Sequence, residues 1–136
     1  MKTFKEYLNS VCACQSAIEW AGDKPVEQVV AECHRGDWLL WLAKKCGVEL
    51  QPLTLAKGHC ANTVRHLMSD ERSLIAVDVA IAFGEGKATR QELDAAATAA
   101  AYAAADTDAN QHKTADICRK YIGDLIIEKV NQTLNP

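Results

Sequence analysis

Apolar residues recur at helical spacing along most of the chain. In residues 3–21, Phe4, Leu8, Val11 and Ile18 stand three, four and seven positions apart, which is typical of a helix with one buried side. Similar patterns predict further helices over residues 25–33, 38–45, 52–68, 69–84 and 89–105, and a last long helix from residue 108. We therefore expect an all-α fold, a compact bundle of about five to seven helices that takes in residues 1–136 as a single domain.

The segment "LIAVDVAIAF" at 74–83 is ambiguous. Its β-branched residues also suit a strand. We favour a helix, because no neighbouring segment offers a second strand to pair with. Asp78 lies inside this apolar run. Either it is buried with a partner from elsewhere, for which Arg35 is one candidate, or it marks the narrow solvent face of the helix, and we prefer the solvent face.

Several residues mark where helices begin and end. Thr89 and Glu92 have the spacing of a capping box, in which each side chain accepts a hydrogen bond from the other residue's backbone N–H. Asp37 is predicted to cap the helix over 38–45, and Gly47 to end it. Further predicted cap, stop or kink positions are Gly22, Ser69, Asp108 and Gly123.

The stretch "RGDWLLWLAKK" at 35–45 is the most unusual part of the chain. Its helix is apolar nearly all round, which predicts a central position in the fold with Trp38 and Trp41 in the core. In one interpretation Asp37 caps this helix and Arg35 ties the cap to another helix end. In the other, Arg35, Asp37 and Trp38 form the rim of a pocket. We prefer the first, because apolar residues beside a cap are normally core.

Composition and charge exclude several classes of function. The chain has 136 residues, a net charge of -3 and a pI of about 5.8. A nucleic-acid partner is not expected, because the basic surface that binds phosphates is missing. The sequence has no apolar run of membrane-spanning length and no signal peptide at its start, so we expect no membrane partner and a cytoplasmic location.

The six cysteines are expected to be reduced in the cytoplasm. They form no CxxC pair, and the chain has no HExxH motif, so no metal site is predicted. No nucleophile elbow, phosphate-binding loop or dinucleotide fingerprint occurs either. The sequence therefore predicts a protein without a cofactor and without catalytic residues, not an enzyme.

Four stretches together resemble a known family. They are "AIEWA", "CHRGDWLLWLA", "DERSLIAVDVAIAFGEGKATRQELDAAATAAAYAA" and "ADICRKYI", in this order. This order is similar to the Imm-5-like family, small helical proteins of bacteria and phages that are described as immunity proteins of polymorphic toxin systems. The motif Arg-Gly-Asp-Trp-x-Leu-Trp-Leu matches residues 35–42, and the closing Arg-x-x-Ile matches 119–122. The resemblance implies an all-helical fold and a non-enzymatic protein that binds a toxin.

Two functional hypotheses follow. The first is an immunity-type protein that binds and blocks a toxin partner, with Asp23, Glu27 and Glu32 as candidate contacts that steer association. The second is a phage- or prophage-encoded protein of small-ligand binding or counter-defence. Its pocket would lie near the Arg-Gly-Asp-Trp motif and would be lined by Arg35, Asp37, Trp38 and Trp41. A homo-oligomer is compatible with both hypotheses.

Overall fold

The predicted all-α fold is confirmed. The computed structural model describes residues 2–95 and 108–136, and every regular element in those ranges is a helix. In chain order the elements are α1 (Phe4–Ser10), α2 (Gln15–Ala21), α3 (Val26–Glu32), α4 (Gly36–Cys46), α5 (Leu50–Asn62), a 3-10 turn (Arg65–Leu67), α6 (Glu71–Gly84), α7 (Arg90–Ala95), α9 (Asp108–Cys118), a π-helical turn (Arg119–Gly123) and α10 (Asp124–Leu134).

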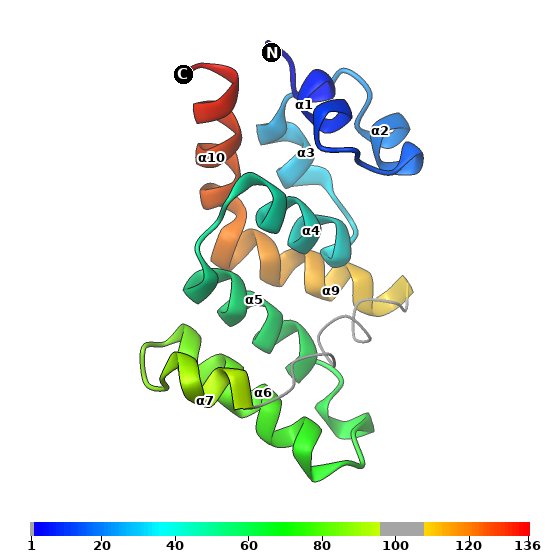
Figure 1. Ribbon diagram of the computed structural model, residues 1–136. Helices are drawn as coiled ribbons and strands as arrows, with labels where there is room; N and C mark the ends of the chain where they lie inside the picture. Colours follow the sequence, from blue (N-terminus) through cyan, green and yellow to red (C-terminus); the bar gives the residue numbers. More distant parts are fainter. Residues whose placement is uncertain (1, 96–107) are drawn as a thin grey trace.

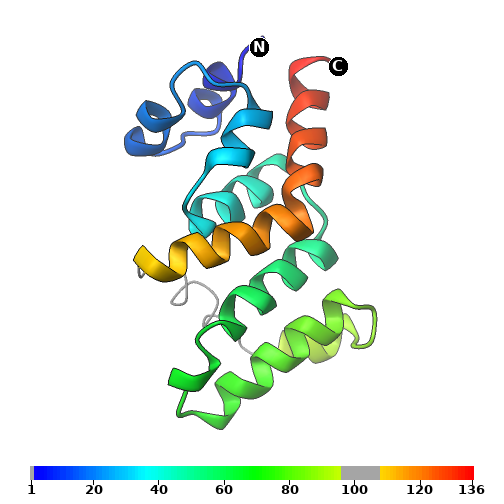
Figure 2. The same ribbon diagram turned by 180° about the vertical axis from the view of Figure 1, so that it is seen from behind.

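Helices α3, α4 and α5 pack along the C-terminal segment formed by α9, the π turn and α10 (Figure 1). Helix α4 packs against α9 on one side, and α5 packs against both α9 and α6. Helix α7 lies on α6 at one end of the molecule, while α1, α2 and α3 lie at the other end, where α1 and α3 contact α10. The reverse view shows the same order, with both termini at the α10 end (Figure 2).

Glycines allow the closest helix contacts. A Cβ built on Gly36 of α4 would stand 2.1 Å from Oγ1 of Thr114 on α9. On Gly58 of α5 it would stand 2.8 Å from the side chain of Ile81 on α6. Glycine has a low helix propensity, so Gly58 weakens the prediction of a helix over 52–68. Helix α5 nevertheless continues through Gly58, where the absence of a side chain lets α6 pack closely.

The predicted helix over residues 3–21 is divided in two. Helix α1 ends at Ser10, and α2 begins at Gln15. Between them Cys12 has a φ of 58°, and its N–H donates to the Asn9 carbonyl at 3.2 Å. This is a left-handed helix ending of the kind that glycine usually supplies. The apolar spacing continues across the break with no Gly or Pro, so the break has no local sequence signal.

Segment 74–83 is helical, as favoured, and forms most of α6. Asp78 is exposed on this helix, as preferred, and its carboxylate accepts two hydrogen bonds from the Arg65 guanidinium, at 2.6 and 3.1 Å. Arg35 as a partner of Asp78 was therefore the wrong candidate. Asp70, not Ser69, caps α6 by accepting a hydrogen bond from the backbone N–H of Arg72 at 2.9 Å.

Other predicted helix ends are confirmed. The Thr89 hydroxyl accepts from the Glu92 N–H at 3.1 Å, and the Glu92 carboxylate accepts from the Thr89 N–H at 3.0 Å. Gly22 and Gly47 follow the last residues of α2 and α4 with positive φ values of 53° and 91°. The alanine run over 96–105 and the side chain of Asp108 lie outside the described residues.

The main core lies where α4 meets the C-terminal segment. Leu39 and Leu40 of α4 are each 1% exposed, while Ile122 and Ile126 are fully buried. Helix α4 is therefore as central as its apolar sequence predicts. Of the helices in residues 2–95 and 108–136, none is long and apolar enough to cross a membrane.

Candidate functional site: an apolar pocket beside Arg35 and Asp37

A pocket of about 410 Å³ opens between the N-terminal helices and α4. Its lining is almost entirely apolar, and Asp37 is the one lining residue that carries a formal charge at neutral pH. The lining residues are Phe4, Leu8, Cys12, Ala13, Cys14, Ala17, Trp20, Ala21, Val29, Cys33, Asp37, Trp38, Leu39, Trp41 and Leu42. Small-molecule sites have this character, an apolar and aromatic cavity with few polar groups.

All three tryptophans of the chain line this pocket. The rings of Trp20 and Trp38 lie 6.1 Å apart between centroids, tilted by 57°. Trp38 and Trp41 are only partly buried. The prediction that they lie in the core was wrong: both pack against the buried core, but they stay partly exposed and line the pocket, whereas Leu40 of the same helix is 1% exposed.

Arg35 and Asp37 form a two-point ion pair at this site. The Arg35 Nη2 donates to Asp37 Oδ2 at 2.6 Å, and Nε donates to Oδ1 at 3.1 Å. Both side chains are about one-third exposed or less. This hydrogen bond with Asp37 raises the pKa of Arg35. Paired guanidinium and carboxylate groups of this geometry are among the stronger hydrogen-bonded contacts in proteins.

Asp37 does not cap α4, contrary to the first interpretation. The helix begins two residues earlier than predicted, at Gly36, with Arg35 at the cap position and no capping hydrogen bond from its side chain. Asp37 therefore falls in the first turn, where the helix dipole favours a negative charge. Its carboxylate is turned to Arg35, which does not tie the helix to another helix end.

A cation lies over each tryptophan ring. The Arg35 Cζ lies 4.5 Å from the Trp38 ring centroid, and the Lys24 Nζ lies 4.3 Å from that of Trp20. Lys45 is more distant from Trp41, at 5.8 Å. A cation over the electron-rich face of an indole is attracted to it. The rings that line the pocket are thus already in contact with positive charge.

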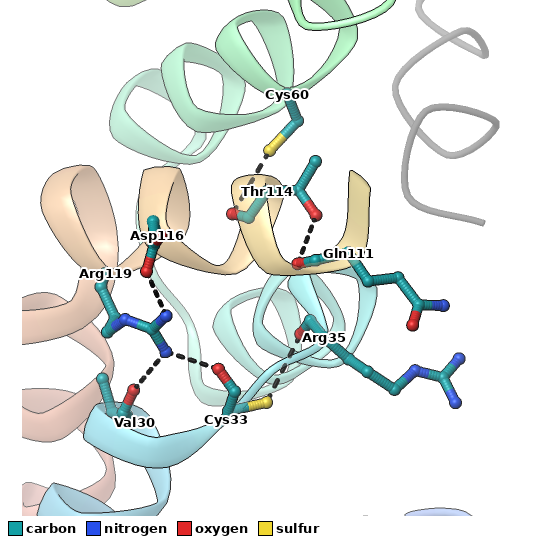
Figure 3. Close-up of polar contacts among 8 residues, drawn as sticks. All are labelled: Val30, Cys33, Arg35, Cys60, Gln111, Thr114, Asp116 and Arg119. Atoms are coloured by element: carbon teal, nitrogen blue, oxygen red, sulfur yellow. Dashed lines mark hydrogen bonds and ion pairs between the residues drawn. The ribbon is translucent and has the colours of Figure 1, made fainter. Parts of the chain in front are cut away.

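The backbone below the site is fixed by Arg119, the first residue of the Arg-x-x-Ile motif, for which no structural role was predicted. Its guanidinium donates to the carbonyls of Val30, at 3.2 Å, and Cys33, and pairs with Asp116 on the preceding turn (Figure 3). These carbonyls are at the end of α3, where backbone acceptors lack helical partners. Arg119 thereby holds the chain that leads into Arg35.

Buried thiols complete this support. The Cys33 Sγ donates to the Arg35 carbonyl at 3.4 Å, and the Cys118 Sγ donates to the Gly36 carbonyl at 3.7 Å. The Cys118 Sγ also lies 3.9 Å from that of Cys60. Burial raises the pKa of Cys33. Within the described ranges, no group of three or more His, Cys, Asp or Glu side chains could hold a metal ion.

The three acidic candidates do not line the pocket. Asp23 and Glu27 are exposed, and the Glu27 carboxylate accepts a hydrogen bond from Asn131 Nδ2 at 3.2 Å. Glu32 pairs with Lys24 at 3.6 Å. The structure thus brings together Arg35, Asp37 and the tryptophans, and leaves Asp23, Glu27 and Glu32 as separate surface positions around the α2–α3 turn and α3.

No protein-family model matches this chain, and no curated protein or solved structure is similar enough to be matched to it. The resemblance to the Imm-5-like family therefore stays a prediction, and the inferences about function below come from the geometry of the site.

Proposed function

We propose that this protein is a non-enzymatic binding protein whose site is the apolar pocket beside Arg35 and Asp37. The observation that carries the proposal is the pocket of about 410 Å³ with three tryptophans in its lining. A water molecule, which is similar in size to a methylene group, takes up about 30 Å³ in the liquid. The cavity therefore suits a ligand with a body of about a dozen non-hydrogen atoms.

Apolar burial supplies the affinity in this proposal. Each square ångström of apolar surface removed from water contributes about 25 cal/mol, and a largely preformed cavity avoids part of the ordering cost of binding. Asp37, the one charged residue in the lining, supplies the polar contact that orients the ligand at one edge of the cavity. This role matches the ligand-binding alternative of the sequence analysis.

Titration of intrinsic fluorescence tests the proposal, because every tryptophan of the chain lines the pocket. We expect 4-tert-butylbenzyl alcohol, an apolar probe of suitable size, to shift the emission in a saturable manner. The substitution Ala17→Phe fills the pocket and should abolish the response. Ala31→Phe is the matched control, because Ala31 is exposed on α3 and does not line the pocket. A response that survives Ala17→Phe would refute the pocket as the site.

We propose as a second candidate the immunity-type role that the Imm-5-like resemblance implies. Asp23, between α2 and α3, and Glu27, on α3, are exposed, and this exposure favours the role. Exposed negative charges accelerate encounter with a basic partner. The test first looks for a toxin gene beside the gene of this chain and then measures binding to the toxin that it encodes. Charge reversal at both positions should slow association and weaken its salt dependence, while Ala17→Phe should leave the association rate unchanged. A rate unaffected by the charge reversals argues against this role.

A further inference from the structure

The charged group that lines the pocket already holds a planar cation. Asp37 accepts two hydrogen bonds from the Arg35 guanidinium, and the same guanidinium lies over the Trp38 ring. A carboxylate beside aromatic faces is the combination that recognises organic cations, because the ring quadrupole and the negative charge both attract them. Arg35 thus shows, within the chain itself, which chemical group these two side chains bind.

The charges around the pocket favour a cationic ligand over an anionic one. Lys24, Arg35 and Lys45 lie over tryptophan rings, but none of them lines the cavity. Lys24 is further neutralised by Glu32. Asp37 is the one charged side chain among the residues that line the cavity. Coulombic energy falls with distance, and exposed charges are screened within about 10 Å at ordinary salt, so the carboxylate decides which charge is preferred.

We propose that the pocket binds an organic cation, an apolar body that carries a quaternary ammonium, amine or guanidinium group. This inference rests on the proposed function and adds the class of ligand. The apolar body fills the cavity between Trp20 and Trp41, and the cationic group takes the place of the Arg35 guanidinium at Asp37 and Trp38. Arg35 swings into solvent, which it can reach because its side chain is 32% exposed.

In this arrangement Arg35 is an internal competitor. The ligand has to displace a group that is tethered two residues from its carboxylate partner, so the free protein resists weakly binding cations. Removal of the Arg35 side chain leaves Asp37 unpaired beside the aromatic rings. The affinity for a cationic ligand should then rise, whereas a residue that itself contacts the ligand would lower the affinity when removed.

A matched pair of probes isolates the charge. The neutral probe is 4-tert-butylbenzyl alcohol, and the cationic probe is 4-(trimethylammonio)benzyl alcohol, which has the same shape with nitrogen in place of the quaternary carbon. We expect the parent protein to prefer the cationic probe. Arg35→Ala should increase the affinity for the cationic probe by about tenfold, which corresponds to about 1.4 kcal/mol. The affinity for the neutral probe should not change. Asp37→Asn should remove the preference for the cation.

Arg65→Ala is the control for loss of an arginine. It breaks a two-point ion pair of the same kind with Asp78, on helices that do not line the pocket, so it should change neither affinity. Arg35→Lys keeps the charge but not the planar fork, and should tighten the cationic probe less than Arg35→Ala does. Circular dichroism melts verify that each variant is folded.

The outcomes separate this inference from the proposed function. If both probes bind equally in the parent and in Arg35→Ala, the cation preference is refuted and the apolar pocket stands. If Arg35→Ala weakens the cationic probe, the competitor role of Arg35 is refuted. Tighter binding of 4-tert-butylbenzoate, the anionic analogue, would also overturn the inference. If no probe binds, the proposed function fails together with it.

Discussion

Gly36 and Thr114 lie in direct contact where α4 crosses α9. A Cβ on Gly36 would stand 2.1 Å from the Thr114 Oγ1, 2.5 Å from its Cβ and 2.8 Å from its backbone carbon. Thr114 is fully buried, and its hydroxyl donates to the Gln111 carbonyl at 3.1 Å. Neither helix can absorb a side chain at position 36 without moving apart. The glycine between Arg35 and Asp37 is thus a packing requirement.

The substitution Gly36→Ala should therefore be strongly destabilising. Overpacking of a core usually costs about 1–3 kcal/mol, and the clash with backbone at this position puts the cost at the upper end. Urea unfolding followed by circular dichroism measures it. Gly47→Asn is the comparison for backbone strain without a clash and should cost less, because a Cβ at Gly47 meets no atom within 4 Å and asparagine is among the residues least strained at a positive φ, here 91°. A Gly36→Ala protein as stable as the parent would contradict the close packing of α4 on α9.

Arg119 should stabilise the chain more than an exposed ion pair does. Hydrogen bonds that involve a charged group contribute about 1.5–3 kcal/mol, and Arg119 donates to the carbonyls of both Val30 and Cys33. We expect Arg119→Ala to lower the free energy of unfolding by about 2–3 kcal/mol. Asp116→Asn removes only the exposed ion pair and should cost less than about 1 kcal/mol. Equal losses in the two variants would place the contribution in the ion pair.

Leu40→Ala should cost more stability than Trp38→Ala, although tryptophan is the larger residue. Leu40 is 1% exposed, and truncation of such a side chain costs about 2–5 kcal/mol. Trp38 is only partly buried and already faces a cavity, so its removal uncovers less apolar surface. Unfolding followed by circular dichroism avoids the loss of the fluorophore. A larger loss of stability in Trp38→Ala than in Leu40→Ala would show that Trp38 belongs to the core.

The Arg65–Asp78 pair predicts a small dependence of stability on acid. The hydrogen bonds from Arg65 lower the pKa of Asp78 below its usual 3.8. A carboxyl group whose pKa is lowered in the folded state stabilises the fold above its unfolded pKa, and this contribution is lost as the pH falls through the folded value. In Arg65→Ala, NMR titration should show the pKa of Asp78 back near 3.8. The stability difference between parent and variant should vanish at a pH well below that value.

Local sequence signals located most of the fold. The spacing of apolar residues predicted the helical elements, and the capping box of Thr89 and Glu92 and the end of α4 at Gly47 were correct, because both depend on neighbours within a few residues. The break at Cys12 was missed. The left-handed conformation there falls on a cysteine instead of a glycine, and the apolar spacing continues across it, so no local pattern marks it.

The site was predicted only in part. The sequence favoured a core helix over a pocket at the Arg-Gly-Asp-Trp motif, whereas in the structure Asp37, Trp38 and Trp41 line a cavity and Arg35 lies beside it. The motif could not show that Trp20 would join them, or that Arg119 would hold the segment from more than 80 positions away. Contacts of this kind depend on how helices pack, and a single sequence contains no pattern that pairs such distant positions.

The π turn at Arg119–Gly123 sets the rotational phase of the C-terminal segment. A π turn has one residue more than an α-helical turn, and each residue of an α-helix turns the chain by about 100°. The extra residue rotates the buried face of α10 relative to that of α9. As a result α9 packs against α4 and α5, and α10 packs against α1, α3 and α4. A chain one residue shorter at this turn would rotate Ile126 and Val130 out of the core. The length of this single turn therefore determines which faces of α9 and α10 are buried at the two ends of the molecule.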